Sequence, residues 1–139
     1  MTRTDFKRLR HFTPAEVTRT GARIKDVQFR TMFVADRFRH FLGCPVKLIK
    51  NGLTTGKHRD PAHPRGEAVD CYPTAKITHY AAYKAALRAG ARAIGIYWNG
   101  RIYSYHLGLG PAWKSWAAVK SAKNAWVYSC LIVDPAKIR

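Results

Sequence analysis

The chain of 139 residues carries 25 Lys and Arg against 8 Asp and Glu, which gives a formal net charge of +17. Its hydrophobic content of 47%, with 12% aromatic residues, excludes an intrinsically disordered polycation, because such a chain lacks the apolar side chains that form a core. No run approaches the roughly eighteen apolar residues of a membrane-spanning helix, and residues 1–10 lack the apolar segment of a secretory signal peptide. We expect one domain over residues 1–139, with no membrane span and no signal peptide.

The first half of the chain predicts two helices, a strand and a loop. Residues 13–16, Thr-Pro-Ala-Glu, have the capping threonine, the first-turn proline and the glutamate of a capping box. A second helix is expected over about residues 27–42 and should end at Gly43. Residues 45–50 alternate like a strand, and residues 51–66 are rich in the Gly, Pro, Thr and His of a loop.

The second half predicts strands with one interposed helix. Residues 67–71 read as a short strand, and Thr74 is expected to cap a third helix that ends at Gly90. A last strand is expected over residues 126–133. This order of elements predicts an α+β fold with a small antiparallel sheet and flanking helices.

The clearest local signal is Asn99-Gly100 between two runs rich in β-branched and aromatic residues, which is typical of a type I′ hairpin. A two-residue turn would place His106 opposite Ala93. His106 would then project from a patch of small residues that leaves room around its ring.

Carboxylates are scarce in this chain, yet three of the eight lie in one window of eleven residues. These are Asp60, Glu67 and Asp70; His63 lies in the same window, and His58 lies two residues before it. Acidic residues clustered with histidines in so basic a chain indicate a site.

His63 and Asp70 are seven positions apart, with Gly66 available for a turn between them. Together with His106 they supply two imidazoles and one carboxylate, a set suited to catalytic zinc with water in the fourth position. Zinc would lower the pKa of that water and polarise a scissile carbonyl group. Six histidines in 139 residues also produce such triples by chance, so hydrogen-bonded structural histidines remain the alternative.

The run His63-x-x-Gly66-x-Ala68-x-Asp70 resembles the zinc-ligand motif of one peptidase family, that of the zinc D-alanyl-D-alanine carboxypeptidases of the VanY type and the phage endolysin L-alanyl-D-glutamate peptidases. The resemblance covers about residues 11–116. Further matches, in the family's order, are an opening helix at 11–16, a helix-to-strand passage at 38–46 and a terminal hairpin with the third ligand at 95–111. Residues 117–139 form a C-terminal extension beyond it.

The resemblance implies a Hedgehog/D,D-peptidase-like zinc peptidase fold and zinc-dependent hydrolysis of peptide bonds in bacterial peptidoglycan stem peptides. His63, Asp70 and His106 map onto the family's metal ligands. The resemblance also implies that the protein is a bacteriophage product that lyses the cell wall. Such a protein would be found in the host cytoplasm before its release, or associated with the virion.

The motif does not identify the general base, because residues 103–105, Tyr-Ser-Tyr, stand where relatives carry an acidic residue or a histidine. The remaining candidates are Glu67, Asp60 and His58. Each also has a structural interpretation; Glu67, for example, would pair with Arg65 as a solvated acid.

Arg59, Arg65, Ser104 and Tyr103 are the candidates for substrate binding. The basic surface predicts peptidoglycan, anionic wall polymers, nucleic acid or other virion proteins as partners. The alternative function is a non-catalytic basic virion or nucleic-acid-binding protein on the same fold, with seven Tyr and four Trp available for base stacking. Binding that falls steeply with salt and ignores chelators would favour that alternative.

Overall fold

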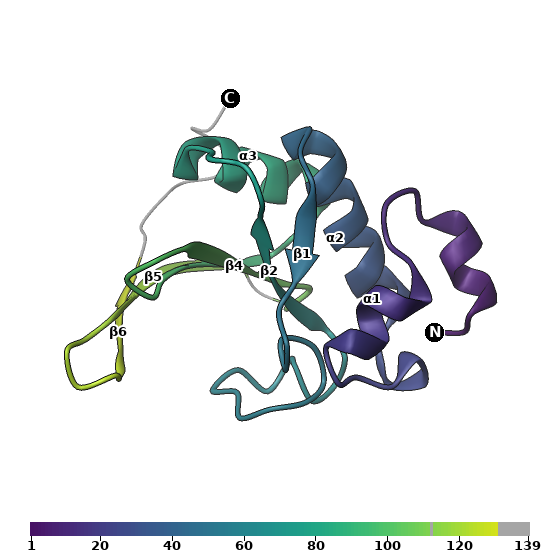
Figure 1. Ribbon diagram of the computed structural model, residues 1–139, viewed down its shortest axis with the longest axis horizontal. Coiled ribbons are helices and arrows are strands. Elements are labelled where there is room, and N and C mark those ends of the chain that lie inside the picture. The colour runs from purple at the N-terminus through teal and green to yellow at the C-terminus, as the bar shows by residue number, and fades with distance from the viewer. Residues whose placement is uncertain (112, 131–139) are drawn as a thin grey trace.

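The computed structural model describes residues 1–111 and 113–130 (Figure 1). The elements, in chain order, are η1 (Thr4–Arg8), α1 (Pro14–Arg19), η2 (Ile24–Asp26), α2 (Phe29–Leu42), β1 (Val46–Leu48), β2 (Ala68–Pro73), α3 (His79–Ala89), β3 (Ala93–Trp98), β4 (Tyr103–Gly108), β5 (Lys114–Lys120) and β6 (Trp126–Cys130). Within these ranges no helix combines the length and apolar character needed to cross a membrane.

The predicted α+β class is confirmed, but the sheet is mixed rather than wholly antiparallel. Its strand order is β1-β2-β4-β3-β5-β6, and β5 runs parallel to β3. The prediction missed β5 because its sequence, Lys-Ser-Trp-Ala-Ala-Val-Lys, lacks a clear apolar alternation. The last strand was expected to reach Val133; β6 is described as far as Cys130, and residues 131–133 lie outside the described residues.

The helix ends follow local chemistry, with one correction. The Glu16 carboxylate accepts the backbone N–H of Thr13 at 2.8 Å, and α2 ends at Gly43, whose φ of +67° suits a glycine. The predicted cap of α3 at Thr74 is wrong. Thr78 caps the helix by accepting the N–H of Ala81, whereas the N–H of Thr74 donates to the carbonyl of Pro45 and extends the contact between β1 and β2.

The β3–β4 hairpin has a longer loop than the Asn-Gly signal predicted. The Asn99 side chain accepts the backbone N–H groups of Arg101 and Ile102, at 2.9 and 3.0 Å, and so holds both residues inside the loop. His106 therefore pairs with Gly95, two positions from the predicted partner Ala93. A shift of two residues leaves every side chain on its predicted face of the sheet.

Strand alternation gives the sheet one apolar face and one polar face. Helices α2 and α3 cover the first face (Figure 1). The buried side chains of Phe38, Ile94 and Leu107 form part of the core there. The loop between β1 and β2 lies on the opposite side of the sheet (Figure 1). Asp70 and His106, which are neighbours in the ladder between β2 and β4, face this second side.

Candidate metal centre

Three side chains from distant parts of the chain meet on the face of the sheet opposite the helices. Nε2 of His63 lies 3.0 Å from Nδ1 of His106 and 3.3 Å from Oδ1 of Asp70. Nδ1 of His106 lies 3.1 Å from the same Asp70 oxygen. Atoms that hold zinc tetrahedrally at about 2.0–2.1 Å are themselves roughly 3.3 Å apart. The spacing of these three atoms fits three corners of such a tetrahedron.

In its neutral form, His63 carries no proton on the nitrogen that faces the cluster. Nδ1 of His63 lies 2.8 Å from the carbonyl oxygen of Leu53. Because a carbonyl oxygen only accepts, Nδ1 carries the proton and donates it. In neutral His63 the lone pair of Nε2 therefore points at the Asp70 carboxylate, an arrangement that a cation or a second proton must stabilise. A backbone carbonyl that fixes the tautomer in this way is a common partner of metal-bound histidine.

The electrostatics of the cluster favour a positive charge between these groups. Burial raises the pKa of Asp70, but hydrogen bonds with His106 and His63 outweigh burial and hold the pKa well below its usual range. Burial lowers the pKa of His63, but the hydrogen bond and charge of Asp70 outweigh burial and leave the pKa above its ordinary value. Asp70 is thus an anion at neutral pH, and its position beside two buried imidazoles attracts a proton or a metal cation.

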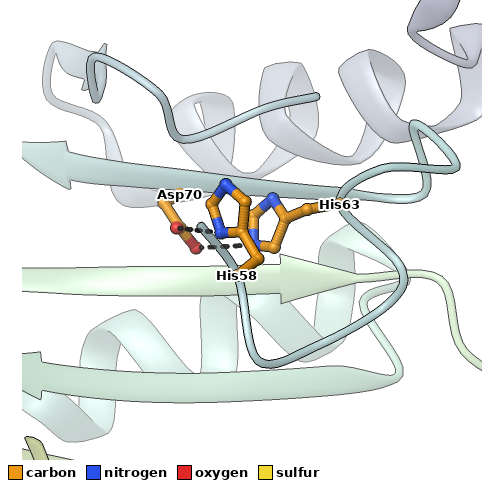
Figure 2. A group of neighbouring side chains, drawn as sticks. All are labelled: His58, His63 and Asp70. Carbon is orange, nitrogen blue, oxygen red and sulfur yellow. Dashed lines mark ion pairs between the residues drawn. The ribbon is translucent and has the colours of Figure 1, made fainter. Parts of the chain in front are cut away.

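His58 brings a third imidazole to Asp70 from the loop. Figure 2 shows His58 and His63 side by side, both facing Asp70; their ring centroids are 3.7 Å apart and the rings are nearly parallel. Nε2 of His58 lies 2.7 Å from the carbonyl oxygens of both Asn51 and Thr55, so this nitrogen carries the proton. The other ring nitrogen, Nδ1, lies 4.0 Å from Oδ2 of Asp70. His58, His63 and Asp70 form a group that could hold a metal ion, since one ligand atom of each lies within 4.8 Å of the others.

Asp60 faces the outer nitrogen of His106. Its Oδ2 lies 3.6 Å from Nε2 of His106 and 3.0 Å from Nζ of Lys114, and the N–H of Ala62 donates to Oδ1. Burial raises the pKa of Asp60, but the hydrogen bonds from Ala62 and Lys114 outweigh it and lower the pKa. Nε2 of His106 is buried and has no hydrogen-bond partner in the described part of the chain. If a metal ion replaces the proton on Nδ1, a carboxylate on this side of the ring would favour the tautomer with a proton on Nε2.

We expect Asp60→Asn to weaken zinc binding by about 10–100-fold, because neutral asparagine favours that tautomer less strongly. Competition with a chromogenic chelator measures the change. Glu67→Gln is the matched control, since it neutralises a carboxylate outside the cluster, and its zinc affinity should equal that of the wild type. An Asp60→Asn variant with wild-type affinity would show that Asp60 does not orient His106.

The cluster lies in a cleft of about 280 Å³ that includes four of the other predicted site residues. These are His58, Arg59, Asp60 and Ser104. Lys50 and Lys57 also line the cleft, so its rim is basic.

Three other predicted site residues lie outside this cleft. Glu67 forms an ion pair with Arg65 at 2.8 Å and accepts a hydrogen bond from Gln28, as its interpretation as a solvated acid predicted. Tyr103 packs edge-on against His79 of α3, with ring centroids 4.1 Å apart. Since Ser104 and His106 face the cleft, strand alternation turns Tyr103 away from it. The structure therefore does not bring Glu67, Arg65 or Tyr103 to the metal cluster.

An aromatic wall that was not predicted from the sequence lies along the cleft. Tyr97, Trp126 and Tyr128 line the cleft, and Trp116 lines an adjoining hollow of about 310 Å³. The rings of Trp116, Trp126 and Tyr128 each meet Tyr97 edge-on. Trp126 and Tyr128 are two positions apart on β6, and this spacing was the sequence signal that they share one face of a strand. Their position near His106 could not be predicted, because β6 joins the sheet through β5, which was not predicted.

Gly95 makes room for one part of this wall. A Cβ atom at Gly95 would lie 2.5 Å from Cε2 of Trp116, so the indole ring rests where a side chain would otherwise stand. The Trp116 ring lies 5.0 Å from the His106 ring, and its N–H donates to the Tyr97 hydroxyl at 2.8 Å. Trp116 thus packs against a residue of the metal cluster.

We expect Gly95→Ala to lower the free energy of unfolding by about 1–3 kcal/mol, because the added methyl group must displace the indole of Trp116. Urea denaturation measures the change. In a Trp116→Leu background the same substitution should cost less, since the smaller side chain leaves space. Equal costs in the two backgrounds would contradict this account of Gly95.

The chain was compared with protein-family models, with curated proteins and with solved structures, and none of them matches it. The resemblance of residues 63–70 to a peptidase motif therefore stays a prediction, and the geometry of the cluster and its cleft is the main guide to function.

Proposed function

We propose that the protein is a zinc-dependent peptidase that hydrolyses peptide bonds in the stem peptides of bacterial peptidoglycan. The observation that carries the proposal is the convergence of His63, Asp70 and His106, with ligand atoms 3.0–3.3 Å apart, in a cleft that can admit a substrate. Structural zinc sites have four protein ligands, whereas three ligands beside a cleft are typical of catalytic sites. The resemblance of residues 63–70 to the peptidase motif supports the same reaction.

The ligand set we propose is His63, Asp70 and His106. Zinc held by these residues would supply Lewis-acid chemistry, since it would polarise a carbonyl group and lower the pKa of a water molecule. His58 is not in this set, because its ring stacks nearly parallel on that of His63 and its Nδ1 lies 4.0 Å from Asp70. The lone pairs of the two stacked rings lie in nearly parallel planes, so His58 and His63 are less well placed to bind one ion than His63 and His106, whose rings are at 73° to each other.

His58 is instead the proposed general base. Two backbone carbonyls hold the proton on its Nε2, which leaves Nδ1 bare and directed toward the cluster. Its side chain is only 11% exposed, so the ring is held in place at the edge of the site. A proton acceptor in this position can take the proton of the attacking water and pass it to the leaving amine.

The basic rim suits an anionic substrate. Lys50, Lys57 and Arg59 line the cleft, and peptidoglycan stem peptides carry free carboxylates. We assign Arg59 and Ser104 to substrate binding, because both line the cleft that holds the cluster. Cell-wall lysis by a bacteriophage product is the biological role that this proposal favours.

The test is mass spectrometry of purified peptidoglycan fragments after incubation with the zinc-loaded protein. New stem-peptide fragments should appear with the wild type and be absent with His63→Ala, and their masses identify the bond that is cut. The control variant His79→Ala removes a histidine on the opposite face of the sheet and should cut as the wild type does. Unchanged fragments with a wild-type protein that holds one zinc per chain would overturn the proposal and favour the non-catalytic alternative.

A further inference from the structure

A second functional surface lies on the helical side of the molecule, away from the metal cluster. A groove of about 310 Å³ runs between the N-terminal segment and the outer side of α2. We call it the basic groove; its lining residues are Arg8, Arg10, Phe33, Asp36, Arg37, His40 and Phe41. Because α2 covers the face of the sheet opposite the loop that carries His58 and His63, a polymer in the basic groove leaves the cleft accessible (Figure 1).

The positive charge of the basic groove is not neutralised by its one carboxylate. Asp36 is only 4% exposed, and its oxygens accept the backbone N–H groups of Arg10 and His11 at 2.7–3.2 Å. In the part of the chain that the structure describes, no ion pair joins Arg8, Arg10 or Arg37 to a carboxylate. The groove therefore presents three arginines that form no ion pair in the described residues, and the oxygens of its one carboxylate, Asp36, are bound by backbone N–H groups instead.

Aromatic rings hold two of these cations in place. The guanidinium of Arg37 lies 5.6 Å from the ring centre of Phe33 and 5.1 Å from that of Phe41. The guanidinium of Arg8 lies 4.5 Å from the ring centre of Phe29. A guanidinium that lies over a ring contacts the ring through its flat face. Its N–H donors lie in the plane of the guanidinium, so they can still bind phosphate oxygens.

The same packing argues against recognition of nucleic-acid bases. Arg37 lies over the ring of Phe33, and Arg37 and Arg88 both lie over Phe41, so guanidinium groups compete with bases for these rings. Apart from its arginines, His40 and the buried Asp36, the lining holds no side chain that could contact a base edge. The groove thus favours phosphate groups over bases.

We propose that the basic groove binds the phosphodiester backbone of a linear poly(alditol phosphate), the kind of anionic polymer attached to bacterial cell walls. Binding of phosphate groups is inferred from the residues of the groove alone. The choice of a cell-wall polymer as the ligand rests on the proposed function. Bound there, the polymer holds the protein on the wall while the cleft on the opposite side of the sheet takes the stem peptide.

The experiment measures binding of fluorescently labelled poly(glycerol phosphate) as a function of salt concentration. The groove variant, Arg8→Gln/Arg10→Gln/Arg37→Gln, should bind at least about tenfold more weakly at low salt. Its slope of log affinity against log salt should also be smaller by roughly 2, at about 0.7 for each lost phosphate contact of a single-stranded polyanion. The matched control, Lys47→Gln/Lys76→Gln/Arg101→Gln, removes the same charge from exposed positions outside the groove and should bind as the wild type does. Circular dichroism verifies that both variants fold.

Two results would overturn this proposal. Equal weakening in the groove variant and the charge-matched control would show that net charge alone attracts the polymer. An oligothymidylate with the same number of phosphates that binds at least tenfold more tightly than poly(glycerol phosphate) would show that the groove recognises bases, as a nucleic-acid-binding protein does. Both arms are repeated with metal-free His63→Ala protein, so failure of the peptidase proposal does not affect the result.

Discussion

His106→Gln is expected to weaken zinc binding by more than 100-fold, whereas His58→Gln should leave zinc affinity near that of the wild type. The reason is the different geometry of the two rings. Nδ1 of His106 lies within 3.1 Å of both the inward nitrogen of His63 and the Asp70 carboxylate, while the ring of His58 is stacked on that of His63. A loss above 100-fold exceeds the range of about 10–100-fold expected for a residue that only orients a ligand.

Zinc competition against a chelator of known affinity measures both variants, with His79→Gln as the control for loss of a histidine far from the cluster. The opposite pattern, loss of zinc in His58→Gln and retention in His106→Gln, would assign the metal to His58, His63 and Asp70. That group also has its ligand atoms close enough to hold an ion. The pair of variants therefore decides between two ligand sets that share His63 and Asp70.

The second large effect concerns turnover. We expect His58→Gln to lower kcat/KM for stem-peptide cleavage by about 10²–10⁴-fold while the protein still binds one zinc per chain. Glutamine cannot accept the proton that the bare Nδ1 of His58 is placed to take. Loss of activity with the metal retained is the result that separates a general base from a ligand.

The measurement is a steady-state assay on a soluble stem-peptide fragment, with zinc content determined on the same samples. Asp60→Asn serves as the comparison, because saturating zinc should largely restore its activity if Asp60 acts only by orienting His106. Full activity of His58→Gln would exclude His58 as the base.

Local sequence signals predicted most helix ends correctly, because those ends depend on contacts within a few residues. Glu16 reaches back to Thr13, and Gly43 and Gly90 take the positive φ angles that end α2 and α3. The Thr74 cap failed for a tertiary reason, since Thr74 hydrogen-bonds to Pro45 from a distant part of the chain. Thr78, four residues later, caps α3 instead.

The candidate ligands were also chosen from sequence, through the scarcity of carboxylates and the run from His63 to Asp70. His106 joins His63 and Asp70 because Asp70 pairs with His106 in the ladder between β2 and β4. The hairpin loop was predicted with the wrong length, yet His106 kept its face because the error was two residues and side chains alternate with a period of two. An error of one residue would have pointed His106 into the core.

By itself, then, the sequence determined the α+β class, most of the local helix caps and the residue types from which a metal site can be built, since these depend on composition and short-range spacing. The tertiary structure alone decided that Asp60 faces His106, that Glu67 and Tyr103 lie away from the cleft, and that β5 and β6 carry the aromatic wall. Each of these facts depends on strand order or on which residues of a loop fold back onto the sheet. Long-range pairing sets both, and such pairing leaves little trace in the spacing of residues along one chain.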